Sequence, residues 1–443
     1  PIESQSLLIE AFDEVAKDEK AVNDMKVWLL KQKQTQDWKT TKATAEACYA
    51  LILTGDDWLS SDEIATITVG GKKLDPKNDP TVSVEAGTGY FKKTWDGEDV
   101  TADMGKVSVT KNDKGVAWSA DLPGEGSSSP IVVGGKVFVT CYSGESGADA
   151  KRLLVCVDAD SGKTLWQDGI AGPEREDSYS GYLTEHGYAS GSPVSDGTNV
   201  YAFFGKAGVV AYTVDGNKLW QTEVGQMSSN RRWGSGASPG LFNDILIVNA
   251  SEEARAIYGL NVKTGEELWK AEYDRLELCF ATPVIVEGEG DVMEAVISMP
   301  GEVWGLNATN GKLRWFCEIG NGGNVSPSVV VGDEAFYTFG GYPQQESNAI
   351  KRGGRKDISK THRLWQSRDS SYVPTPLLHD GHLYWVTDKG QAFCANAATG
   401  ETVTRTRLSG LASGGRPVYA SPVKAGDIIY VVTRRSGTFV FDA

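Results

Sequence analysis

The side chains best suited to recognise a ligand occur in polar loops between apolar segments of the chain. A long loop at residues 171–190 carries His186, and loops further along carry the other candidates, Arg231, Arg232, Glu252, Arg255 and Arg434. Guanidinium and carboxylate groups form strong hydrogen bonds with charged or polar ligands, and loops on a rigid scaffold are a common place for binding. We therefore predict that these six residues form a ligand-binding set. The alternative is a solvated rim whose charges form local ion pairs.

Signatures of catalysis and of metal binding are absent from the sequence. It holds no Gly-rich phosphate loop, no G-x-S-x-G nucleophile motif and no paired-carboxylate signature. His186, His379 and His382 are too widely spaced to predict a metal site, and the last two flank a turn at Asp380-Gly381. The sequence therefore predicts no catalytic residue and no metal ligand.

Six cysteines are scattered along the chain, and none belongs to a Cys-x-x-Cys pair: Cys48, Cys141, Cys156, Cys279, Cys317 and Cys394. Zinc sites and thioredoxin-like sites are therefore excluded. We expect buried free thiols, which pack as small apolar groups. Since Cys141 and Cys156 fall on segments expected to form adjacent strands, one disulfide between them is the alternative.

Charge and hydropathy exclude two further classes of protein. The formal net charge is -15, from 44 Lys and Arg against 59 Asp and Glu, so a polyanion such as a nucleic acid would be repelled. No apolar run approaches the roughly 18 residues that a membrane-spanning helix needs. We expect neither nucleic-acid binding nor a membrane span.

A repeat organises residues 115–443. A Ser or Thr followed by Pro recurs along this part of the chain, at Pro130, Pro193, Pro239, Pro283, Pro327, Pro376 and Pro422. After a first interval of 63 residues, these prolines are 44 to 49 residues apart. Most are followed by β-like runs, and this period is typical of a propeller blade with four short strands.

A second mark of the repeat is a glycine turn followed by Trp, which recurs at an equivalent position in most of the repeat units. The glycine supplies a positive φ in the turn, and the indole is expected to pack between blades. Thr404 replaces Trp in the sixth unit. The predicted docking tryptophans are Trp118, Trp166, Trp220, Trp269, Trp315 and Trp365.

These marks predict a mainly β chain with a seven-bladed propeller at residues 113–443. The last unit stops at Ala443, before its own turn and Trp. We therefore expect a strand around Asp113–Trp118 to complete the last blade and remove an open sheet edge. A truncated eight-bladed propeller is the alternative.

Several segments of this repeat resemble the pyrroloquinoline-quinone-like (PQQ-like, or quinoprotein-type) propeller proteins: Tyr182–Tyr188, Phe204–Val209, Val303–Asn307, Ser371–Pro376 and Asp380–Trp385. The resemblance covers residues 115–443. It implies a periplasmic, cell-envelope or secreted bacterial protein, with a protein or carbohydrate ligand on the loop face of the propeller.

The same resemblance bears on cofactors. Enzymes of the group commonly place the quinone over a Trp, beside a disulfide between adjacent cysteines, with Ca²⁺ held by Glu, Asn and Asp. This sequence has no Cys-Cys pair, and no residues match the calcium ligands. We therefore expect no cofactor, with PQQ and Ca²⁺ as the alternative.

The first part of the chain follows a different pattern. Residues 1–58 read as a helical segment and residues 59–112 as a small β-domain. Gln34–Leu51 resembles the end of the thioester domain in bacterial α2-macroglobulin-family proteins, and Glu85–Tyr90 resembles the β-domain that follows there. Cys48 does not match the thioester context, so this fragment is not expected to trap proteases. An artificial or accidental fusion of the two parts is one interpretation, and a natural fusion is the other.

Taken together, these features predict a non-catalytic, extracytoplasmic binding or scaffold protein, similar in kind to the outer-membrane assembly propellers. It would be fused to an α2-macroglobulin-like fragment that lacks the thioester. A quinone-dependent oxidoreductase of the PQQ type is the alternative.

Overall fold

The computed structural model describes residues 117–144, 149–412, 415–426 and 428–442, together with short stretches before residue 111. The chain divides into two compact units, Pro1–Val116 and Ala117–Ala443. Strands dominate the described residues, so the predicted mainly β fold is confirmed.

The first unit contains two small antiparallel sheets. One has the order β2 (Lys72–Lys73), β1 (Thr66–Val69) and β5 (Val107–Thr110), and the other pairs β3 (Val82–Val84) with β4 (Phe91–Lys93). These strands lie where the sequence predicted β-structure. The segments that resemble α2-macroglobulin-family proteins lie outside the described residues.

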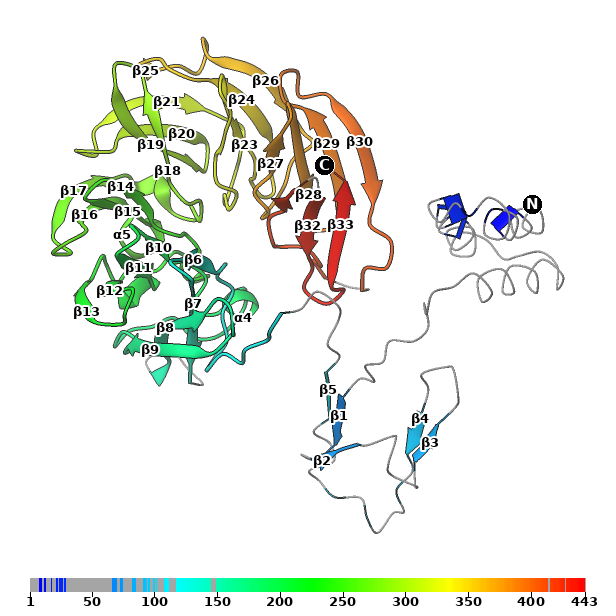
Figure 1. Cartoon of the computed structure of the whole chain (residues 1–443). Coiled ribbons are helices and arrows are strands. Elements are labelled where there is room, and N and C mark those ends of the chain that lie inside the picture. Colours follow the sequence, from blue (N-terminus) through cyan, green and yellow to red (C-terminus); the bar gives the residue numbers. More distant parts are fainter. Residues whose placement is uncertain are drawn as a thin grey trace. The chain divides into compact units, whose positions relative to one another are not determined.

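The second unit is a succession of antiparallel sheets that follow one another around an axis, coloured from cyan to red in Figure 1. The first sheet contains β6 (Ile131–Val133), β7 (Lys136–Ser143), β8 (Lys151–Asp158) and β9 (Thr164–Ile170). The second contains β10 (Val194–Ser195), β11 (Asn199–Phe203), β12 (Val209–Thr213) and β13 (Lys218–Thr222). The third contains β14 (Gly240–Phe242), β15 (Ile245–Ala250), β16 (Ala256–Asn261) and β17 (Glu267–Glu272).

Four more sheets complete the described part of this unit. The fourth contains β18 (Val284–Gly288), β19 (Val292–Met299), β20 (Glu302–Asn307) and β21 (Leu313–Glu318), with β25 (Lys356–Asp357) added parallel to β21. The fifth contains β22 (Val330–Val331), β23 (Ala335–Thr338), β24 (Ser347–Lys351) and β26 (Arg363–Ser367). The sixth contains β27 (Leu377–His379), β28 (His382–Val386), β29 (Gln391–Asn396) and β30 (Thr402–Arg407). The last contains β31 (Val423–Ala425), β32 (Ile428–Val432) and β33 (Thr438–Asp442).

A separate apolar core lies between each sheet and the next. Between the second and third sheets, for example, Tyr201 and Phe203 pack with Leu246 and Val248, all at most 2% exposed. Equivalent clusters join the other consecutive pairs. Each sheet therefore buries its apolar residues against its neighbours, as expected of a repeat architecture.

Four of the predicted tryptophans, Trp166, Trp220, Trp269 and Trp365, lie on the fourth strand of their sheets and dock on the following sheet, and Trp118, which lies in no strand, docks on the first sheet. The indole N–H donates to a backbone carbonyl there, with distances of 2.7 Å for Trp118 to Ala159, 3.1 Å for Trp166 to Val214, 2.8 Å for Trp220 to Val262, 3.1 Å for Trp269 to Ala308 and 2.9 Å for Trp365 to Ala397. Each ring lies against the turn glycine of the next sheet, as Trp269 does against Gly311, whose φ is +68°. A Cβ at that glycine would clash with the ring, so the turn requires glycine.

Trp315 is fully buried but has a different partner. Its indole N–H donates to Glu294 at 2.8 Å, and its ring stacks on Phe336 with centroids 5.6 Å apart. The fifth sheet lacks the usual tight turn between its third and fourth strands, because the connection there is longer and forms β25. The usual docking turn is therefore not available to this indole.

A β-bulge recurs beside the tryptophan position in six of the described sheets. The register of the third and fourth strands shifts next to the residue that faces the Trp, for instance between Gly259 and Leu260 opposite Trp269. The same shift occurs opposite Thr404, between Cys394 and Ala395. A bulge bends the strand locally and redirects a side chain, which here aims the indole at the next sheet.

The strand expected to complete the last sheet is not observed. Residues 117–122 are described, yet they form no strand and do not pair with β33. Trp118 itself lies on the first sheet near Val155, and its indole N–H donates to Ala159, which is the same docking contact that the other tryptophans make. Residues 113–116 lie outside the described residues, and the choice between seven and eight blades stays a prediction.

Candidate functional site

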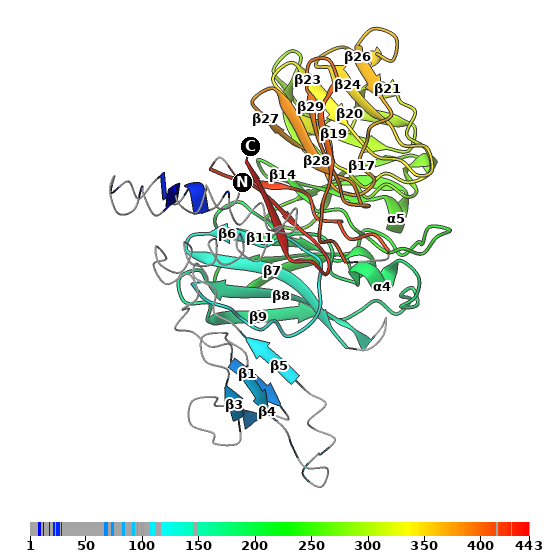
Figure 2. The same ribbon diagram turned by 90° about the vertical axis from the view of Figure 1, so that its right-hand side faces the viewer.

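Because the strands of each sheet alternate in direction, two kinds of connection lie at the same end of the strands. These are the loops between second and third strands, and the connectors from a fourth strand to the next sheet at residues 171–193, 223–239, 273–283, 319–329, 368–376 and 408–422. We call this side the loop face. All six predicted ligand-binding residues belong to it, and Figure 2 shows α4 (Leu183–His186) and α5 (Ser251–Ala254) on the same side of the unit.

His186 at the end of α4 is engaged by the protein on both ring nitrogens. Nε2 lies 2.7 Å from the carbonyl oxygen of Trp233, and Nδ1 lies 2.6 Å from the Ser190 hydroxyl. Since a carbonyl only accepts, Nε2 carries the proton and Nδ1 accepts from Ser190. Burial lowers the pKa of His186, so the ring is neutral. His186 therefore ties the first connector to the second.

Glu252 and Arg255 also hold connectors together. Glu252 is 4% exposed and accepts a hydrogen bond from the backbone N–H of Leu278 at 2.8 Å, while burial raises its pKa to about 7. Arg255 lies 3.3 Å from Glu277, which accepts from the backbone N–H of Asn230 at 2.6 Å. These contacts join α5 to the second and third connectors.

The remaining three arginines of the predicted set lie at the surface. Arg231 and Arg232 are exposed, and the guanidinium of Arg231 lies 5.7 Å from the ring centroid of Trp233. Arg434 pairs with Glu185 of α4 and lies 5.3 Å from the Tyr419 ring. The structure thus divides the predicted set into three buried or paired positioning residues and three surface arginines.

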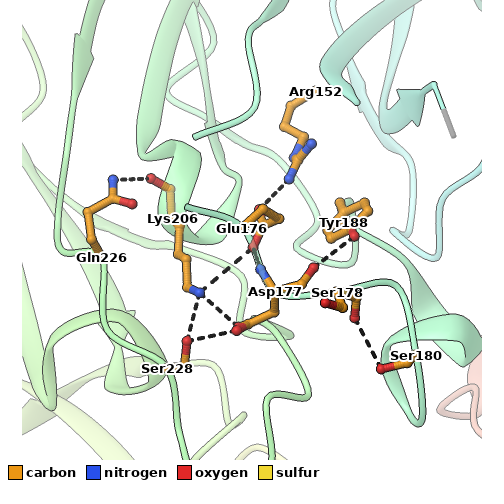
Figure 3. A network of polar contacts seen from close by, with 9 residues as sticks. All are labelled: Arg152, Glu176, Asp177, Ser178, Ser180, Tyr188, Lys206, Gln226 and Ser228. Carbon is orange, nitrogen blue, oxygen red and sulfur yellow. Dashed lines mark hydrogen bonds and ion pairs between the residues drawn. The ribbon is translucent and has the colours of Figure 1, made fainter. Parts of the chain in front are cut away.

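A buried ion-pair network that the sequence did not single out lies beneath this face (Figure 3). Arg152 pairs with Glu176, and Lys206 donates to Asp177 at 2.8 Å and to Ser228 at 2.7 Å. Ser228 donates in turn to Asp177 at 2.8 Å. The residues come from β8, from the connector at 171–193, from η5 (Gly205–Ala207) and from the next connector. The network therefore anchors the long connector to the first two sheets.

Glu253 lies at the edge of this network and is 2% exposed. Burial, reinforced by the neighbouring Glu252, raises its pKa to about 8, and within the described residues its Oε2 atom has no hydrogen-bond partner. It lines a cavity of about 20 Å³ together with Lys206 and Gly205. That volume fits one water molecule, so it offers no room for an organic ligand.

Elsewhere on the loop face, an arginine is held between tyrosines. The guanidinium of Arg416 lies 4.5 Å from the ring centroid of Tyr372 and 5.2 Å from that of Tyr342, and its Nε atom is 3.2 Å from Asp388. Asn324 donates to the Tyr372 hydroxyl at 3.3 Å. We call Arg416, Tyr342, Tyr372 and Asp388 the arginine–tyrosine cluster. Its residues come from different blades, so no local sequence pattern indicates it.

The cysteines are free thiols wherever the structure describes them, namely at Cys141, Cys156, Cys279, Cys317 and Cys394. The favoured prediction is confirmed for these residues, and the disulfide between Cys141 and Cys156 is wrong. In the ladder Cys141 faces Leu153 while Cys156 faces Phe138, so the two thiols are out of register.

No two described cysteines form a disulfide, and no group of three or more His, Cys, Asp or Glu side chains among the described residues has the geometry to hold a metal ion. No helix in the described part of the chain has the length and apolar character to cross a membrane.

The repeat matches a known protein family. A family described as outer membrane protein assembly factor BamB matches residues 150–406 and 351–443. Outer membrane protein assembly factor BamB of Yersinia pestis is 21% identical over 347 residues, covering 66% of this chain and 81% of that protein. The same factor of Burkholderia pseudomallei is 23% identical over 362 residues, covering 73% and 87%.

Solved structures with a similar chain path include BamB from Moraxella catarrhalis, with a TM-score of 0.48 and 16% identity over 73% of this chain and 93% of that one. A europium-containing methanol dehydrogenase has a TM-score of 0.46 and 12% identity, over 70% and 72%.

Proposed function

Because the chain belongs to the family of the outer membrane protein assembly factor BamB, we propose that it is a non-catalytic scaffold that binds a partner protein on its loop face. The family match, which begins at β8 and runs through β33, carries this proposal. The name of the relatives also supports a role at the bacterial cell envelope, in the assembly of outer membrane proteins.

The composition of the loop face supports a protein partner more than a carbohydrate. Exposed Arg231 and Arg232 lie beside Trp233, which contacts Tyr182 at a centroid distance of 4.7 Å and Phe280 at 6.3 Å. Arg, Trp and Tyr are the residue types that dominate protein–protein binding energy. Such a mixed aromatic and cationic surface suits a protein segment with apolar and acidic side chains.

Complementation tests this proposal in the host. Deleting the gene should lower the amount of folded outer membrane proteins, and the wild-type full chain should restore it. The double variant R231E/R232E should fail to restore it, because it reverses two charges of the loop face. R355E is the matched control: Arg355 is 55% exposed and lies on the opposite face, between the third and fourth strands of the fifth sheet. Full restoration by R231E/R232E would contradict the proposal.

We also propose that the scaffold acts without a quinone. The absence of adjacent cysteines in the sequence and of a metal-ligand cluster in the described residues supports this. Titration with pyrroloquinoline quinone and Ca²⁺ should give no binding in the micromolar range. Tight binding with alcohol-dependent or sugar-dependent dye reduction would instead establish the oxidoreductase alternative.

For the first unit, we propose descent from the C-terminal part of an α2-macroglobulin-family protein. The sequence resemblance of Gln34–Leu51 and Glu85–Tyr90 supports it, and the chain divides at Val116 and Ala117 into separate units. With no thioester in this fragment, the scaffold function is assigned to the second unit.

A further inference from the structure

The chain contains two Asn-Gly pairs, Asn310-Gly311 and Asn321-Gly322, and the structure exposes the asparagine of the first pair but not that of the second. Asn310 lies in the outer turn between β20 and β21. Asn321 is 1% exposed, and its side-chain amide donates to the carbonyl of Phe339 at 3.4 Å. Asn is a chemically labile residue, and a following glycine, which has no Cβ, leaves its backbone nitrogen open to attack on the Asn side chain. Exposure therefore distinguishes the two pairs.

The turn folds the side chain of Asn310 back onto the backbone that would attack it. The backbone N–H of Lys312 donates to Oδ1 of Asn310 at 3.1 Å. A hydrogen bond to this oxygen withdraws electrons from Cγ and stabilises the oxyanion that forms when a nucleophile adds there. The nucleophile is the nitrogen of Gly311, whose N–H donates to the carbonyl of Asn307 at 2.8 Å. Because this bond must break first, local opening of the exposed turn sets the rate of attack.

Equivalent turns in three other sheets carry a hydroxyl at this position in place of the amide. The residue before the turn glycine is Ser161 in the first sheet, Thr264 in the third and Thr399 in the sixth. Each hydroxyl accepts a hydrogen bond from the backbone N–H two residues further on, as Oδ1 of Asn310 does in the fourth sheet. This bond needs only a side-chain oxygen. A Thr at position 310 would therefore keep the turn and remove the labile amide.

The same turn forms the docking site of Trp269. The indole ring lies so close to Gly311 that a Cβ there would come within 2.4 Å of it, and the indole N–H donates to Ala308 at 3.1 Å. An isoaspartyl residue at position 310 would run the main chain through its own Cβ and Cγ, which inserts an additional atom before Gly311. Since the ring leaves no free space at this glycine, the longer main chain would displace the turn from the indole.

We infer that Asn310 is a site of spontaneous deamidation and that its isoaspartyl product weakens the docking of Trp269 on the fourth sheet. In the first step the nitrogen of Gly311 loses its proton and bonds to Cγ of Asn310, while Nδ2 takes up a proton and leaves as ammonia. Solvent water then opens the resulting succinimide at either carbonyl, which gives aspartate or isoaspartate. The net reaction is the hydrolysis of an amide, and both products carry one more negative charge than the original chain.

Incubation of the folded full chain at mildly alkaline pH, followed by peptide mass spectrometry, tests the first part of this inference. Trypsin separates the two pairs, because Asn310 lies in the peptide 276–312 and Asn321 in the peptide 315–351. In the folded chain, conversion should be at least about tenfold faster at Asn310 than at Asn321, since reaction at a buried residue waits for local unfolding. In urea the two rates should become similar. N310T should remove the fast conversion from the peptide 276–312.

Urea unfolding tests the second part. Anion exchange isolates the converted chains by their added charge, and electron-transfer fragmentation measures the isoaspartyl fraction. Chains rich in isoaspartate should unfold at a lower urea concentration than the fresh chain. N310D, which adds the charge without lengthening the main chain, and N310T after the same incubation should both keep the midpoint of the fresh chain. Equal rates at Asn310 and Asn321 in the folded chain, no conversion at Asn310, or an isoaspartyl form as stable as N310D would each overturn the inference.

Discussion

Among single residues, the buried carboxyls of α5 respond most strongly to pH. Burial raises the pKa of Glu253 from its ordinary 4.5 to about 8 and that of Glu252 to about 7. The folded chain therefore binds protons more tightly than the unfolded chain, and this stabilisation is fully present below pH 4.5 and is lost as the pH rises through 7 and 8. The melting temperature should fall between pH 6 and pH 9, and E253Q, which stays neutral, should flatten this decline. Parallel pH profiles of E253Q and the wild type would contradict it.

Trp269 offers a residue-scale test of the docking contact. Its side chain is 7% exposed, donates to Ala308 and lies against Gly311. W269A should lower the free energy of unfolding by about 3–5 kcal/mol, because it leaves a large cavity between the third and fourth sheets. The neighbouring L268A is the control: Leu268 is 48% exposed, and its loss should cost at most about 0.5 kcal/mol. Urea unfolding of both variants measures the difference.

The sequence could predict such residues only where they repeat. The Trp and glycine marks recur in phase, so their docking positions were predictable, whereas Lys206 and Asp177 meet once and across 29 residues of chain. The acidic residues Glu174, Glu176 and Asp177 were the sequence signal that could have indicated an ion-pair network in this connector. Polarity alone did not distinguish His186, which is half-buried, and Glu252, which is buried, from Arg231, which is exposed.

At the scale of elements, the long connector at residues 171–193 depends on the buried network. K206M would leave Asp177 buried without its cation, a loss of about 3–5 kcal/mol for a buried pair. We expect rapid proteolysis within residues 171–193 and loss of the amide-exchange protection there. K218M, at an exposed Lys of β13 in the same second sheet, should leave the cleavage pattern unchanged.

Most elements of the second unit follow from local signals, and two do not. Pro and Trp marks bracket the strands of the first five sheets, and the sixth keeps the Pro with Thr404 in place of Trp, so the phase of the repeat was enough to predict them. The parallel strand β25 depends on a long connection that folds back on β21, which no local pattern encodes. Near Trp118, which shares the turn and Trp spacing of its counterparts, the docking contact with the first sheet forms, but residues 117–122 make no ladder with β33.

At the scale of the whole molecule, the boundary between the two units makes a truncation test decisive. Removing residues 1–110 should leave the melting temperature of the second unit nearly unchanged, because that unit begins at Ala117. Removing residues 1–122 should lower it by several degrees, about what the loss of an indole and its hydrogen bond to Ala159 costs. Scanning calorimetry of both truncations measures the difference, and equal melting temperatures would show that Trp118 does not stabilise the sheets.

The contact between the last sheet and the first connector differs in type from the contacts between consecutive sheets. Within the described chain, apolar cores join each sheet to the next, while Val423, Val432 and Val440 of the last sheet remain 54–62% exposed and Arg434 reaches α4 through an ion pair. Ionic strength acts on these two kinds of contact in opposite directions. Salt screens an exposed ion pair, whereas excluded salts such as sulfate strengthen apolar burial. In concentrated sulfate the stacked sheets therefore become more stable, while the contact between Arg434 and Glu185 weakens. We expect local unfolding to begin at the contact between the last sheet and α4 under these conditions.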